Sequence, residues 1–72
     1  MDDILLDVRE LEPPEPLEKA LESLPLITPE RRVRMLIHRE PFMLYDILRR
    51  EGFRYSCQST PDGSFEVIIY RS

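Results

Sequence analysis

The side chains that could carry out chemistry gather in two short, proline-containing stretches of this chain. The first is RELEPPEP, over residues 9–16, and the second is HREP, over residues 38–41. An imidazole changes its charge near neutral pH, so the histidine beside carboxylates could act as an acid, a base or a ligand. These stretches form the candidate binding site, whose residues are Arg9, Pro13, Pro14, Glu15, Pro16, His38, Arg39, Glu40 and Pro41.

The single histidine also has a structural interpretation. At the end of a strand such a residue is more often held by hydrogen bonds than used in chemistry, and we favour that reading. A metal ion needs at least three protein ligands, which here could only be His38, Glu40 and one of Glu10, Glu12 or Glu15. We therefore expect neither a metal nor a cofactor.

Catalytic signatures are missing from the sequence. It contains no glycine-rich phosphate loop, and no serine or cysteine has a plausible base beside it. The single cysteine, Cys57, shares a strand face with Phe53 and Tyr55, so we expect a buried, protonated and unreactive thiol. These observations predict a protein that is not an enzyme.

Alternating apolar residues predict the four strands that position these stretches. The strands run over residues 4–8, 32–38, 53–57 and 65–69, and each has one apolar face. Between the last two strands, Pro61-Asp62-Gly63 is typical of a tight reversal.

Two helices are predicted between the first three strands. The first starts at Pro14 or Pro16, carries apolar residues at positions 17, 20, 21 and 24 on one face, and is ended by the segment 25–29. The second begins at Pro41 and ends at Gly52, a residue suited to a left-handed cap.

The order strand, helix, strand, helix, strand, strand predicts an α+β two-layer sandwich. Right-handed crossovers place both helices on one face of a four-stranded mixed sheet. No repeat or linker interrupts the pattern, so residues 1–72 are expected to form one domain. The two proline-containing stretches should then meet at one edge of the sheet, where parallel strands end and helices begin.

The other face of the sheet should be open to solvent. The polar residues expected there are Asp7, Arg34, Arg54, Ser56 and Glu66. Four apolar residues should point the same way, namely Leu5, Leu36, Ile68 and Tyr70. If these four are adjacent, they form an apolar strip through which two copies could pair as a homodimer. Isolated exposed hydrophobic residues are the equally acceptable alternative.

The charge of the chain is unevenly distributed. The net charge is −4, with 2 − 9 = −7 over residues 1–30 and 7 − 3 = +4 over residues 31–54. This asymmetry could steer an anionic partner, but we favour mutual neutralisation of the two regions. Net acidity argues against nucleic-acid binding. An acidic start and the lack of an apolar run of about 20 residues argue against a signal peptide and a membrane span, so we expect a cytoplasmic protein.

Two long segments carry a resemblance to a known family. LDVRELEPPEPLEKALESL and HREPFMLYDILRREGFRY resemble the uncharacterised bacterial DUF2249 family, which is related to the TusA-like (SirA-like) sulfur carriers. The similarity spans residues 6–71. It implies a sheet in the order 1-2-4-3, with strand 4 antiparallel to the others.

The resemblance also bears on the proline loop. Sulfur carriers of this fold have Cys-Pro-x-Pro before the first helix, and their cysteine carries a persulfide. Pro14 and Pro16 match the two prolines of that motif, whereas Pro13 stands in place of the cysteine. A pyrrolidine ring cannot carry sulfur, so persulfide transfer from this loop is excluded.

The sequence thus predicts a non-catalytic binding or protein-interaction module. Its partner is expected to be an unidentified protein or a small anion, recognised at the two proline-containing stretches. Two alternatives stay open, namely sulfur or redox chemistry at an exposed Cys57 and a metal, anion or acid–base site centred on His38.

Overall fold

The computed structural model describes residues 3–71. In chain order its elements are β1 (Ile4–Asp7), α1 (Glu15–Ser23), the 3-10 helix η1 (Leu24–Leu26), β2 (Val33–Ile37), α2 (Phe42–Arg50), β3 (Arg54–Ser59) and β4 (Phe65–Tyr70). The strands form one sheet in the order β1-β2-β4-β3. β1 is parallel to β2, and β4 is antiparallel to both of its neighbours. The predicted α+β fold and strand order are confirmed.

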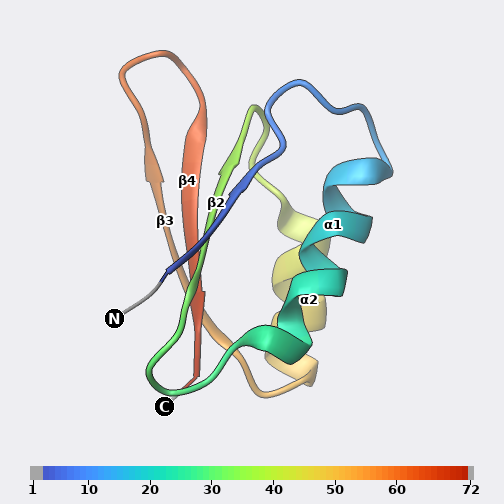
Figure 1. Ribbon diagram of the computed structural model, residues 1–72. Helices are drawn as coiled ribbons and strands as arrows, with labels where there is room; N and C mark the ends of the chain where they lie inside the picture. The colour runs from blue at the N-terminus through green and yellow to red at the C-terminus, as the bar shows by residue number, and fades with distance from the viewer. Residues whose placement is uncertain (1–2, 72) are drawn as a thin grey trace.

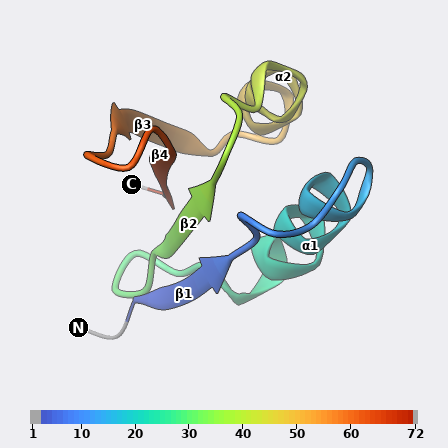
Figure 2. The same ribbon diagram turned by 90° about the horizontal axis from the view of Figure 1, so that it is seen from above.

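The molecule has two layers. Both helices lie side by side on one face of the twisted sheet, as predicted (Figure 1, Figure 2). The loops that lead into α1 and α2 lie at the same end of the sheet as the β3–β4 hairpin, at the top of Figure 1. This end of the molecule therefore brings together three segments that are far apart in sequence.

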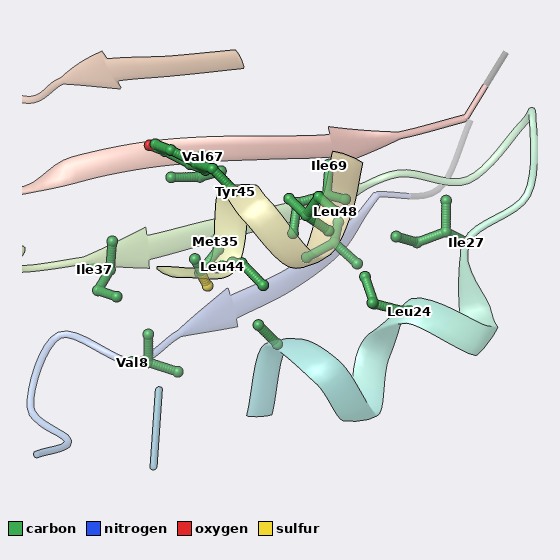
Figure 3. Close-up of a cluster of buried hydrophobic side chains, with 12 residues drawn as sticks. Val8, Leu24, Ile27, Met35, Ile37, Leu44, Tyr45, Leu48, Val67 and Ile69 are labelled. Atoms are coloured by element: carbon green, nitrogen blue, oxygen red, sulfur yellow. The ribbon is translucent and has the colours of Figure 1, made fainter. Parts of the chain in front are cut away.

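The hydrophobic core fills the space between the two layers (Figure 3). Because alternate residues of a strand share a face, the pattern that predicts the strands also selects the core residues. Val33 and Met35 of β2 are fully buried, and so are Leu44 and Leu48 of α2. Each such side chain stabilises the fold by about 1.5–3 kcal/mol. The other buried apolar residues are Val8, Ala20, Leu24, Ile27, Ile37, Tyr45, Val67 and Ile69.

Prolines and glycine set the ends of the helices. Pro14 occupies the N-cap position of α1, and Pro16 lies in its first turn. The predicted end of this helix, Leu24, instead begins η1, because Pro25 has no N–H with which to continue the α-helical ladder. Gly52 follows α2 with a φ of +83°, a left-handed conformation that side-chain-bearing residues rarely adopt.

Apolar and charged side chains alternate on the uncovered face of the sheet. In the register of β2 and β4, Leu36 lies opposite Glu66 and Arg34 lies opposite Ile68. Arg34 Nε donates a hydrogen bond to Glu66 Oε2 at 2.6 Å. This ion pair crosses between Leu36 and Ile68, which are both half-buried. Charge thus interrupts the apolar strip that the sequence suggested, and Leu5 is its one highly exposed member.

Candidate functional site

The two proline-containing stretches meet in a pocket of about 390 Å³. Their proximity follows from the sheet, because β1 and β2 are parallel neighbours whose carboxyl ends reach the same edge. Prolines set the path of the first stretch, in which a cis peptide bond joins Pro13 to Pro14. The pocket is lined by Pro13, Pro14, Pro16, Leu17, Met35, Ile37, His38, Arg39, Glu40, Pro41, Phe42, Met43 and Leu44.

The pocket is apolar in its depth and at its rim. Met35, Ile37 and Leu44 belong to the buried core and form its floor. Phe42 and Met43, in the first turn of α2, are 68% and 70% exposed, more than any other large hydrophobic residue between positions 3 and 71. Two adjacent exposed apolar side chains beside an apolar pocket make a surface suited to contact with another molecule.

Glu40 is held at the pocket by a hydrogen bond from the protein interior. Tyr45 donates its hydroxyl hydrogen to Glu40 Oε2 at 3.1 Å. The Tyr45 ring stacks on Tyr55 with centroids 4.1 Å apart, and Phe42 meets it edge-on at 5.9 Å. Burial raises the pKa of Tyr45, so its hydroxyl remains a donor at neutral pH. Tyr45 therefore contacts both the exposed Phe42 ring and the Glu40 carboxylate.

Cys57 lies on β3, two residues after Tyr55. Its side chain is half-buried rather than buried as predicted, because β3 is an edge strand with one neighbour only. Burial nevertheless raises the pKa of the thiol. A thiol with a raised pKa is mostly protonated at neutral pH and is a poor nucleophile.

Arg9 does not join the pocket, contrary to the prediction that it would converge there with His38 and Arg39. Its guanidinium binds Asp7 with Nη2 and Oδ2 2.7 Å apart, and Asp62 with Nη1 and Oδ2 3.2 Å apart. The hydrogen bond with Asp7 is the main reason why the pKa of Arg9 is raised. Two carboxylates therefore neutralise this cation, and it is not available to an anionic ligand of the pocket.

A second, polar hollow of about 560 Å³ lies on the other side of His38. His38 is exposed and lines both hollows. A hydrogen bond from the Thr60 hydroxyl lowers the pKa of Asp62, and the Ser64 backbone N–H adds a bond at 3.1 Å. The lining residues of the polar hollow are Asp7, Arg9, Glu10, Leu11, His38, Asp62 and Ser64.

The remaining candidate residues divide between the pocket and the surface. Arg39, Glu40 and Pro41 line the pocket, whereas Glu15 is exposed at the start of α1 and does not. Within residues 3–71, no three His, Cys, Asp or Glu side chains lie close enough together to hold a metal ion. The geometry therefore gives no support to the metal site considered around His38.

Sequence reasoning missed part of this surface. It treated Phe42 and Met43 as ordinary helix residues and Asp62 as a turn residue only. The signal for the first pair was present, because an amphipathic helix does not normally place two adjacent large apolar residues on its solvent side. No local signal marks Asp62 as a partner of Arg9, which lies 53 residues away.

Comparison with solved structures defines the class of fold. The crystal structure of a SirA-like protein from Desulfitobacterium hafniense superimposes with a TM-score of 0.77 at 21% identity, covering 96% of this chain and 95% of that one. The family model described as an uncharacterized conserved protein, DUF2249, matches residues 5–71. The chain belongs to this family. The search of curated proteins found no match.

No helix within residues 3–71 is long and apolar enough to cross a membrane.

Proposed function

We propose that this protein is a non-catalytic interaction module that binds an apolar side chain of a partner in the pocket between the β1–α1 and β2–α2 loops. The observation that carries the proposal is the apolar pocket together with the exposure of Phe42 and Met43 at its rim. Its volume of about 390 Å³ lies at the small end of the range for ligand sites, and it suits one large side chain.

The charges around the pocket argue against a small anion as the ligand. Arg9 is neutralised by two aspartates, so Arg39 is the guanidinium of the candidate site that keeps no carboxylate partner within the described residues. The first turn of α1 carries Glu15 and Glu18, which counteract the attraction of a helix N-terminus for an anion. An apolar ligand needs no cation at the site.

The chemistry of the chain also argues against a sulfur-transfer role. Pro13 occupies the position of the carrier cysteine in the resemblance, and the pKa of the single thiol is raised by burial. A sulfur carrier needs a thiolate that is exposed at neutral pH. We therefore favour binding over sulfur or redox chemistry.

Titration of the isotope-labelled protein with N-acetyl-leucinamide, followed by NMR, tests the proposal. We expect the amide signals of Leu17 and of residues 38–44, except Pro41, to move. N-acetyl-alaninamide should bind about tenfold or more weakly, because each buried methylene contributes about 0.8 kcal/mol. Equal affinity for the two probes, or shifts confined to the opposite end of the sheet, would contradict the proposal.

A pair of matched variants provides the control. Met43→Glu places a charge on the rim and should weaken binding of the leucine probe, while the exposed position tolerates the change. Leu26→Glu makes the same kind of change at another exposed apolar residue, which does not line the pocket. It should leave the affinity unchanged.

A further inference from the structure

We infer that the partner is a protein segment in which a basic residue lies next to the apolar residue that enters the pocket. This inference rests on the proposed function and specifies its partner. The apolar side chain occupies the pocket, the segment crosses His38, and the basic side chain lies over the polar hollow. His38 lines both the apolar pocket and the polar hollow. A segment that leaves the pocket across His38 therefore enters the polar hollow.

The polar hollow has an excess of negative charge. Its lining holds three carboxylates, from Asp7, Glu10 and Asp62, and the guanidinium of Arg9, so these four groups sum to 1 − 3 = −2. Hydrogen bonds lower the pKa of Asp7, chiefly through Arg9, and of Asp62, chiefly through Thr60. Both aspartates are therefore ionised at neutral pH.

Glu10 is the carboxylate of this hollow that remains available to a partner. It is exposed, and it makes no ion pair within the described residues, whereas Asp7 and Asp62 both bind Arg9. Exposed Glu12 and Glu15 extend the negative charge along the loop that borders the pocket. An ammonium or guanidinium group of the partner is thus attracted to this side of His38.

The position of Arg39 gives the bound segment a direction. Arg39 lines the apolar pocket but not the polar hollow, and it has no ion-pair partner between residues 3 and 71. In the lining of the apolar pocket the charges of Arg39 and Glu40 offset each other, whereas carboxylates are in excess on the Glu10 side, so a basic side chain is attracted more strongly to the Glu10 side. The charge pattern therefore favours one orientation of the segment over the reverse.

Three matched peptides test the inference by NMR titration of the full chain. Each is acetylated, amidated and built of glycine and serine around a central Leu-Lys, Leu-Gln or Leu-Glu pair. We expect Leu-Lys to bind about threefold more tightly than Leu-Gln, as one or two exposed ion pairs allow, and Leu-Glu to bind most weakly. The differences should shrink in about 1 M salt, where the Debye length is about 3 Å.

Two carboxylate variants separate the local charge from the net charge. Glu10→Gln should remove most of the preference for Leu-Lys over Leu-Gln. Glu22→Gln changes the net charge equally at an exposed position of α1 that lines neither hollow, and it should leave the preference intact. An equal effect of both variants would overturn the assignment of the basic residue to the polar hollow.

The other outcomes distinguish this inference from the proposed function. Equal affinity for all three peptides, with shifts around the pocket, would overturn the inference and leave the proposed function standing. The absence of shifts with every peptide and with N-acetyl-leucinamide would overturn both. Movement of the same signals on concentrating the protein alone would identify a second copy of this chain as the occupant and would also overturn the inference.

Discussion

Arg9 Nη1 lies 3.2 Å from Asp62 Oδ2, and this contact joins the loop after β1 to the β3–β4 hairpin. The same guanidinium binds Asp7. The arrangement removes a cation from the candidate anion site and brings the carboxylate of Asp62 to the edge of the polar hollow. One long-range contact therefore makes the charge next to the pocket more negative, because it adds the Asp62 carboxylate to those of Asp7 and Glu10.

Asp62→Asn should lower the melting temperature at pH 7. Hydrogen bonding in the folded state lowers the pKa of Asp62 below its ordinary value of 3.8. Its contribution to stability is therefore present in full above that value and is lost as the pH falls through the lower, folded-state pKa. Thermal melts followed by circular dichroism should show a difference between parent and variant at pH 7 that disappears in strong acid.

Glu22→Gln is the control for this pH dependence. It neutralises an exposed carboxylate of α1 for which the described residues provide no ion pair. Its effect on the melting temperature should be small at every pH. A difference for Asp62→Asn that persisted unchanged in strong acid would show that the carboxylate charge is not the cause.

Tyr45→Phe should lower the free energy of unfolding by about 1 kcal/mol, the usual net value of one hydrogen bond. The variant keeps the ring that stacks on Tyr55 and removes only the hydroxyl that donates to Glu40. Urea denaturation measures the change. Tyr45→Leu also removes the stacked ring and should cost more, so equal losses for the two variants would contradict this division.

Cys57 should react slowly with a thiol reagent at neutral pH. Burial raises the pKa of its thiol above the ordinary value of 9.0, so the thiolate that reacts is scarce in the folded protein. Denaturant should accelerate labelling. A rise in pH above 9.0 should also accelerate it, because more of the thiol is then ionised. Labelling of the folded protein as rapid as that of the denatured protein would instead reopen the sulfur or redox alternative.

A homodimer through the uncovered face of the sheet is a separate proposal about assembly. It would bury the exposed side chain of Leu5 and the half-buried side chains of Leu36, Ile68 and Tyr70. Light scattering should then give twice the chain mass for the parent and the single mass for Leu36→Glu. Ser56→Thr, at an exposed position of the same face, serves as the mild control. Identical masses for parent and Leu36→Glu would refute the dimer.

Much of the fold was predictable because its causes are local. Alternation of apolar residues marked every strand, and prolines and glycine marked the starts and ends of the helices. The parallel pairing of β1 with β2 then required the two proline-containing stretches to meet. The strand order came from the family resemblance, since four strands can be arranged in several orders with the same local patterns.

The sequence by itself determined the elements, the edge at which the two loops meet and the absence of a cysteine from residues 9–16. Only the tertiary structure decided which charges remain free, because an ion pair such as Arg9 with Asp62 depends on the distance between segments 53 residues apart. It also decided that the space between the loops is an apolar pocket, since the floor residues, among them Met35 and Leu44, come from different elements. Residue types are local properties, whereas neutralisation and burial depend on which neighbours the folded chain supplies.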